Sequence, residues 1–155
     1  MSEVKPLPES IVKCIYSEGG LGRAAWQQGK LREAESHFLK AWDAIPEPKV
    51  QHDYSQSLSH GFVDFFRDTK QFEKAKHWIE VMREVYAPHS PQSESYISFL
   101  QGEVHFAAEE WDKAYDCFDT QYQRFQYAAF KGSDKKYWDF YKKEKEKRKR
   151  IKSGT

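Results

Sequence analysis

Three side chains on one stretch of the chain have the types and spacing of metal ligands. Asp53, His60 and Asp64 are separated by seven and four residues, so in a helix they share one face. Carboxylate and imidazole groups bind zinc in proteins, usually as part of a set of three or four ligands with matched geometry. The spacing implies no ligand beyond these three. We therefore expect a polar helix face here and no metal site.

The sequence motifs of the commoner catalytic sites are missing. The glycine run from Gly19 to Gly22 has no strand before it and no lysine-serine ending, so it is not a phosphate-binding loop. No Gly-x-Ser-x-Gly nucleophile motif occurs. Cys14 and Cys117 carry no nucleophile signature and are expected to be reduced, buried side chains. We therefore expect a protein that is not an enzyme, with no catalytic residue and no cofactor.

A short frame that occurs three times predicts the elements of the chain. Each copy has a large apolar residue, two mostly charged residues, an alanine and, four residues later, another bulky apolar residue. The alanines are Ala34, Ala75 and Ala114, and the bulky residues that follow them are Phe38, Ile79 and Phe118. Spacings of three and four place these residues on one helix face, where the small alanine lets a neighbouring helix approach. Gly22 and Gly102, twelve residues before their alanines, are expected where two helices cross most closely.

The first copy resembles the tetratricopeptide repeat family, through Leu21-Gly22, the step from Ala34 to Phe38, and Pro46. The third copy keeps the glycine and the alanine-to-phenylalanine step, and the second has Phe62-Val63 at the Leu-Gly place. The alanines are 41 and 39 residues apart, against a family period of about 34, which implies longer helices or connections. The resemblance implies an all-α fold, a right-handed solenoid of three helix pairs plus a C-terminal capping helix, in a small stand-alone protein of bacterial type.

Helix-breaking prolines and glycines and helix-capping residues predict where the domain and its helices begin and end. We expect an extended segment over residues 1–9 and one helical domain over 10–141. Its helix pairs fall at about 10–46, 50–88 and 93–127, and its cap at 134–141. Tyr137, Trp138 and Tyr141 are spaced to cover the last pair, whose apolar side would otherwise be exposed. Residues 142–155 are expected to be a basic, solvated tail.

In the family that this chain resembles, the first helix of each pair lines a concave groove. The resemblance therefore implies a partner-binding surface on three helices, made of Tyr16, Arg23, Trp26, His60, Asp64, Arg67, Tyr96, Phe99, Glu103 and Phe106. Aromatic and charged side chains together are typical of binding hot spots. For Trp26 and Phe106, packing in the core remains an equal alternative. The opposite, convex side, with Arg32, Glu35 and Lys76, is expected to be an ordinary solvated face.

Charge is distributed unevenly along the chain. Residues 131–155 hold eleven Lys or Arg and four Asp or Glu, whereas the other residues hold fourteen basic and twenty acidic side chains. The body is therefore acidic and the C-terminal part basic. No positively charged start followed by an apolar run, and no apolar stretch of membrane-spanning length, is present. We expect a cytoplasmic protein that does not enter a membrane.

Binding of a protein partner is the function that these features favour. An acidic body suits an immunity protein that neutralises a basic toxin domain. A secretion or assembly chaperone of the same repeat class is an alternative, and so is an RNA-associated protein that uses the basic tail, although nucleic acid is the less expected partner. A cochaperone for heat-shock chaperone tails is not expected, because the chain has no asparagine and Gly19 and Gly61 stand where polar clamp groups would be needed. The partner and the oligomeric state are left open.

Overall fold

The chain is all-helical in a computed structural model that describes residues 5–86 and 92–154, with no strand in that part. The prediction of an all-α protein is confirmed. Two compact units form, Met1–Glu94 and Ser95–Thr155, where the sequence predicted one domain over 10–141. Each unit packs mainly within itself. The predicted stop at Pro88 and the connector that begins at His89 lie outside the described residues.

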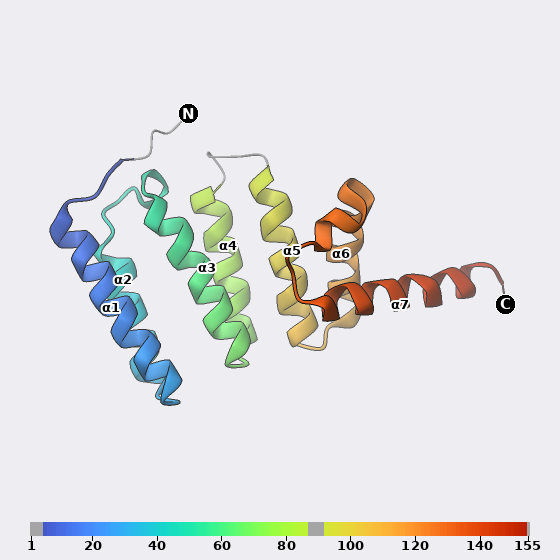
Figure 1. Ribbon diagram of the computed structural model, residues 1–155, viewed down its shortest axis with the longest axis horizontal. Coiled ribbons are helices and arrows are strands. Elements are labelled where there is room, and N and C mark those ends of the chain that lie inside the picture. Colours follow the sequence, from blue (N-terminus) through green and yellow to red (C-terminus); the bar gives the residue numbers. More distant parts are fainter. Residues whose placement is uncertain (1–4, 87–91, 155) are drawn as a thin grey trace. The chain divides into compact units, whose positions relative to one another are not determined.

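The first unit consists of two antiparallel helix pairs (Figure 1). Its elements are α1 (Glu9–Gln27), α2 (Leu31–Ala44), the 3-10 turn η1 (Lys49–Gln51), α3 (Asp53–Asp68) and α4 (Phe72–Tyr86). The glycine pair Gly19-Gly20 does not interrupt α1. Helix α2 ends just before Pro46, which cannot continue a helix. Lys5 of the preceding segment bonds the Gln51 carbonyl through its backbone N–H, at 2.7 Å.

The second unit is built around α6. Its elements are α5 (Gln92–Ala107), whose first three residues belong to the first unit, α6 (Trp111–Phe125), the 3-10 turn η2 (Gln126–Phe130) and α7 (Lys135–Lys152). Asp134 caps α7, because its side chain accepts from the backbone N–H of Lys136 at 3.0 Å. Helix α7 runs to Lys152, well past the expected end near Tyr141.

The same turn joins the two helices of each pair. The residues with positive φ are Gly29, Lys70 and Glu109, at 75°, 61° and 60°. In each turn the following N–H bonds a carbonyl five residues back, at 2.9, 2.7 and 2.9 Å for Lys30, Gln71 and Glu110. This is the Schellman motif, which satisfies carbonyl groups at the end of a helix. Three copies of one turn, five residues before each repeated alanine, show that the copies share local geometry as well as sequence.

The repeated alanines lie at the helix contacts, as predicted. Ala34, Ala75 and Ala114 are fully buried. Gly22 and Gly102 are buried as well, and a Cβ at either position would stand within 2.6 Å of a phenylalanine ring. Contacts that close do not occur between real atoms, so these two positions need glycine.

Aromatic side chains contribute to both cores. In the first unit Phe62 stacks on Trp78 with ring centroids 3.9 Å apart, and Trp42 meets Trp78 edge-on. In the second unit the core contains Phe99, Tyr115, Phe118, Phe130, Tyr137 and Tyr141 around Ala114. The prediction that aromatic residues of α7 cover the last helix pair agrees with these contacts, because Tyr137 and Tyr141 are both buried.

Contacts with α6 explain the length of α7. The guanidinium of Arg148 lies 4.0 Å from the ring centroid of Tyr115 and pairs with Asp112 at 2.6 Å. Lys145 lies over the ring of Tyr122 at 5.2 Å. These cations sit near the C-terminal end of the helix, where they also interact favourably with its dipole. The expected end of the helix near Tyr141 is therefore corrected, because Lys145 and Arg148 have partners on another helix, although most side chains from residue 142 on are exposed, as predicted.

Within the described ranges, every helix is too short or too polar to cross a membrane.

Candidate binding cleft

A cleft of about 430 Å³ opens between α1 and α3 in the first unit. Helix α2 forms its floor through Phe38 and Ala41, and Phe62 of α3 adjoins them. The walls come from α1 (Ile15, Tyr16, Gly19, Gly20, Arg23 and Trp26) and from α3 (Tyr54, Ser57, Leu58 and Gly61). A volume of this size falls in the range of ligand-binding pockets.

Glycines make the cleft wide. Gly19 and Gly20 of α1 and Gly61 of α3 face it, and a Cβ added at any of them would meet no atom within 4 Å. Glycine inside a helix costs about 0.5–1 kcal/mol relative to alanine. Gly22 is needed for packing, whereas these three have no packing role in the residues described. What they provide is open space between two helices.

Two tyrosines from opposite walls meet at one end of the cleft. The rings of Tyr16 and Tyr54 make an edge-to-face contact with centroids 6.2 Å apart. Hydrogen bonding with the Tyr16 side chain raises the pKa of the Tyr54 phenol above its usual value, with burial and the charge of Asp53 adding to it. Tyr16 is nevertheless 68% exposed, so one face of its ring is available to a ligand. Aromatic rings in this position can supply large, amphipathic contact area.

Arg23 is the charged residue in the lining of the cleft. Its side chain is exposed, and no carboxylate in residues 5–86 or 92–154 pairs with it. The nearest acidic residue in sequence, Glu18, is instead engaged by His37 at 2.6 Å. An unpaired guanidinium beside apolar walls favours a ligand that carries a negative charge.

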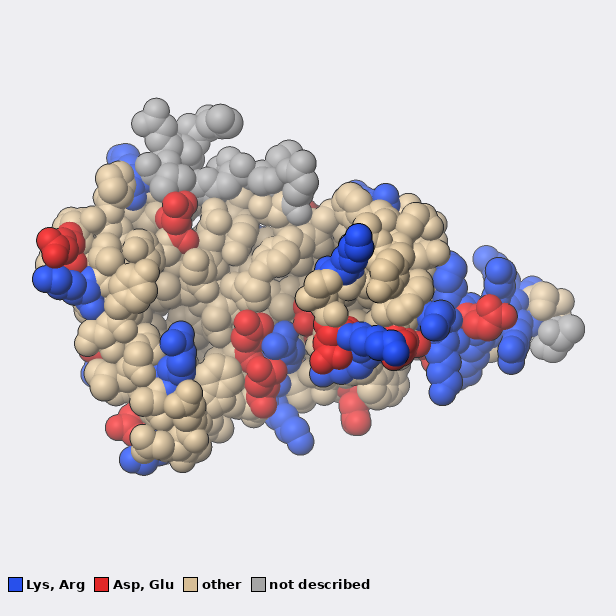
Figure 2. Space-filling view, in the orientation of Figure 1, with Lys and Arg blue, Asp and Glu red and all other residues tan. Residues whose placement is uncertain are grey.

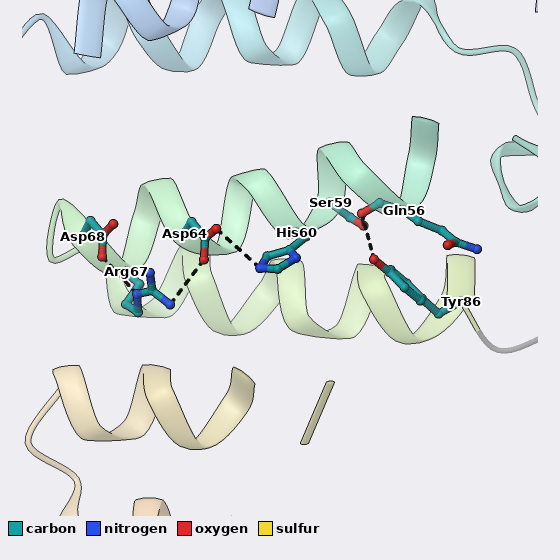
Figure 3. Close-up of polar contacts among 7 residues, drawn as sticks. All are labelled: Gln56, Ser59, His60, Asp64, Arg67, Asp68 and Tyr86. Atoms are coloured by element: carbon teal, nitrogen blue, oxygen red, sulfur yellow. Dashed lines mark hydrogen bonds and ion pairs between the residues drawn. The ribbon is translucent and has the colours of Figure 1, made fainter. Parts of the chain in front are cut away.

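The polar residues predicted on α3 form a chain of contacts along that helix, shown in Figure 3. Asp64 contacts His60 at 3.4 Å and Arg67 at 3.2 Å, and Arg67 also pairs with Asp68 at 2.9 Å. None of the four lines the cleft. Their arrangement along successive turns follows from spacings of three and four, and each carboxylate is already engaged by a basic group.

A neighbouring hydrogen bond ties α4 to α3 at the other end of this face. The hydroxyl of Tyr86 donates to the carbonyl of Gln56 at 3.3 Å, and Ser59 donates to the same carbonyl at 3.0 Å (Figure 3). Burial raises the pKa of the Tyr86 phenol. The Tyr86 bond joins α4 to α3, which carries one wall of the cleft, whereas the Ser59 bond lies within α3.

The predicted residues of α5 divide between surface and core. Tyr96 is 45% exposed and Glu103 is half-buried. Phe99 is buried, and its ring packs on Phe118 at 4.9 Å and on Phe130 at 5.3 Å. Its assignment to a partner surface is therefore corrected, because the core of the second unit takes the whole ring.

Phe106 also packs mainly against other side chains of the second unit. Its ring meets Trp111, Tyr137 and Phe140 with centroids 5.2–5.3 Å apart. Trp26, for which core packing and the partner surface were equal alternatives, has both roles. It packs edge-on against Phe65 at 5.0 Å and still lines the cleft, half-buried.

Sequence reasoning found three lining residues, namely Tyr16, Arg23 and Trp26, and missed most of the α3 wall. Tyr54, Ser57 and Leu58 lie six, three and two residues before the predicted His60, on another side of the same helix. The glycines were the feature of the sequence that could have located this wall. Gly22 is explained by the packing of Phe38 against it, whereas no large side chain packs against Gly61.

The described residues contain no group of three or more His, Cys, Asp or Glu side chains placed to hold a metal ion. His60 and Asp64 do approach one another, but Arg67 occupies the other oxygen of that carboxylate.

In comparisons with known proteins, the chain gives no significant match to a family model, to a curated protein or to a solved structure.

Proposed function

We propose that this chain is a non-enzymatic interaction module, a repeat protein of the tetratricopeptide type, that binds a protein partner through the face on which α1 and α3 lie. The observation that carries the proposal is the cleft, with apolar and aromatic walls and one unpaired cation. Sites of this composition suit an anchoring side chain of a partner. A right-handed solenoid arrangement and a cytoplasmic location are parts of the same proposal.

Among protein partners, a toxin domain bound by an immunity protein remains our first candidate, and a secreted or assembling substrate is the alternative. The acidic body that suggested a toxin is partly neutralised within the second unit, where Arg148 and Lys145 pair with Asp112 and Asp119. Charge steering of a basic toxin is weaker for that reason. The cleft itself is compatible with both partner classes.

Site-specific photo-crosslinking in the native host tests the proposal. A benzophenone amino acid at Ser57, on the exposed wall of the cleft, is compared with one at Ser36, exposed on α2 outside the lining. We expect one protein to be captured from Ser57 and not from Ser36, and mass spectrometry then separates a toxin from a secreted substrate. Capture from Ser36 alone, or from neither position, contradicts binding through this face.

A second candidate is RNA association through α7, favoured by its exposed basic side chains. Figure 2 shows Lys and Arg gathered over the C-terminal part of this helix. Lys143, Lys147 and Lys149 have no ion-pair partner within the described ranges. Changing these three to glutamine leaves the contacts of Lys145 and Arg148 in place. If RNA binds here, the variant should bind more weakly and with a shallower dependence on salt concentration.

A further inference from the structure

We infer that the occupant of the cleft is a peptide segment of the partner that presents an aromatic side chain next to a carboxylate. This inference rests on the proposed function and specifies the chemistry of the partner. The aromatic ring would lie on the floor of the cleft against Phe38, and the carboxylate would pair with Arg23.

The walls favour an aromatic group. Trp26, Phe38 and Phe62 already meet one another or their neighbours edge-to-face, with Phe38 and Phe62 centroids 6.2 Å apart. A further ring on this floor continues the same pattern, and such aromatic contacts are favourable beyond the area that they bury. Leu58 and Ile15 add apolar area on both sides.

Charge favours a carboxylate. Arg23 is exposed at the cleft, has no partner in the part of the chain that the structure describes, and has no basic neighbour in the lining. A guanidinium recognises a carboxylate through two parallel hydrogen bonds. The pairing takes place near solvent, so it selects between ligands by a modest factor.

The glycines favour a peptide over a small acid. Gly20, Gly61 and Ser57 are exposed, so the cleft continues onto the surface along both helices. Without side chains at Gly19, Gly20 and Gly61, an extended backbone can lie close to α1 and α3. An enclosed pocket for a small molecule would not need open ends.

The glycines also supply the measurement. The chain has eight, and glycine amides fall in an uncrowded region of a ¹⁵N-HSQC spectrum. We would titrate the full chain with acetyl-Ala-Phe-Asp-Ala-amide, with its Phe→Ala and Asp→Asn forms, and with N-acetylphenylalanine. The signals of Gly19, Gly20 and Gly61 should move, while Gly132 and Gly154, in the second unit, serve as internal controls.

The expected result is binding that the Phe→Ala peptide weakens at least tenfold and the Asp→Asn peptide about twofold. In the Arg23→Gln variant the Asp and Asn peptides should bind equally. Gly61→Leu should fill the cleft and abolish the shifts at Gly19 and Gly20, whereas Ser36→Leu adds the same side chain on the exposed side of α2 and should not. Leucine is a better helix former than glycine, so Gly61→Leu is expected to fold.

Three outcomes overturn the inference. The Ala peptide could shift the cleft glycines as strongly as the Phe peptide, the Asp and Asn peptides could bind the natural chain equally, or N-acetylphenylalanine alone could bind as tightly as the peptide. The last result would identify a small acid as the occupant. If a partner is crosslinked from Ser57 and one of these results is also obtained, the proposed function stands and only the inference about the peptide is wrong. The two proposals can therefore be tested separately.

Discussion

The ring of Phe38 lies over the α-carbon of Gly22, so closely that a methyl group added to Gly22 would stand 2.5 Å from ring carbon Cε1. Gly102 and Phe118 repeat this relationship at 2.6 Å. Both pairs are sixteen residues apart, so the crossing has the same construction in two copies. In each, a large ring fills the space that the missing side chain leaves.

Alanine substitution should have opposite effects on stability at glycines that pack against a ring and at glycines with open space beside them. Gly22→Ala and Gly102→Ala should each lower the free energy of unfolding by about 1–3 kcal/mol, because the ring must move. Gly19→Ala and Gly61→Ala should raise it by about 0.5–1 kcal/mol, since their Cβ atoms meet no neighbour. Urea denaturation measures all four. Equal destabilisation by all four substitutions would contradict the packing role of Gly22 and Gly102.

The second repeat copy suggests a substitution that would restore stability to a Gly22 variant of the first copy. Val63 and Ile79, sixteen residues apart and both buried, stand at the places of Gly22 and Phe38. Gly22→Val alone should be strongly destabilising. Adding Phe38→Ile should recover part of the loss, because the smaller side chain makes room for valine. A double-mutant cycle gives the coupling energy, and additive effects would show that the two positions are not matched in volume.

The turns between paired helices predict stabilising glycines. Lys70 and Glu109 adopt positive φ, which is unfavourable for residues with a Cβ. Lys70→Gly and Glu109→Gly should each stabilise the chain by about 1 kcal/mol in thermal or urea unfolding, whereas Gly29→Ala should destabilise it by a similar amount. Lys40→Gly, at an exposed position in the interior of α2, is the control and should be destabilising. A loss of stability in Lys70→Gly would be inconsistent with the Schellman geometry.

Tyr141 makes the second unit sensitive to high pH. Burial first, then the hydrogen bond that its hydroxyl donates to Asp119 at 2.6 Å, raises its pKa far above the unfolded value of about 10. The folded state therefore keeps a proton that the unfolded chain releases. The resulting stability is fully present below about pH 10 and falls as the pH rises further.

Tyr141→Phe should flatten this alkaline loss, measured by urea unfolding at several pH values between 8 and 11. At pH 7 it should cost about 1–2 kcal/mol through the lost bond to a carboxylate. Tyr127→Phe is the matched control, because Tyr127 is 51% exposed. Some pH dependence should remain, because the pKa values of Tyr86 and Tyr115 are also raised, in both cases by burial first. An unchanged alkaline profile in Tyr141→Phe would refute the assignment.

Arg148 should matter more than its neighbours in the basic run. Arg148→Ala loses the contact with the Tyr115 ring and the pair with Asp112, and should cost about 1–2 kcal/mol. Arg148→Lys should recover less than half, because an ammonium group lacks the planar face that stacks on tyrosine. Lys149→Ala, an exposed position one residue along, should be within about 0.5 kcal/mol of the natural chain. Equal effects at both positions would return this segment to the status of a solvated tail.

Local patterns in the sequence determined the helices and their contact points. The three alanines, Gly22 and Gly102 were predicted at helix contacts because their size and spacing act within one or two turns. Gly29 and Pro46 located the ends of α1 and α2 for the same reason. Lys70 and Glu109 escaped prediction, since a residue other than glycine gives no local sign of a left-handed turn, and the hydrogen bonds around it must hold it there.

Only the tertiary structure decided which side of each helix is buried and which is exposed. Phe99 and Tyr96 lie three residues apart on one helix, yet the first is buried and the second exposed, because η2 and α7 cover one side. The C-terminal part of α7 is ordered by Tyr115 and Asp112 of another helix. The cleft depends on Gly19, Gly20 and Gly61 facing one another across α1 and α3. Each of these results comes from contacts between residues distant in sequence, which composition and spacing along one helix do not contain.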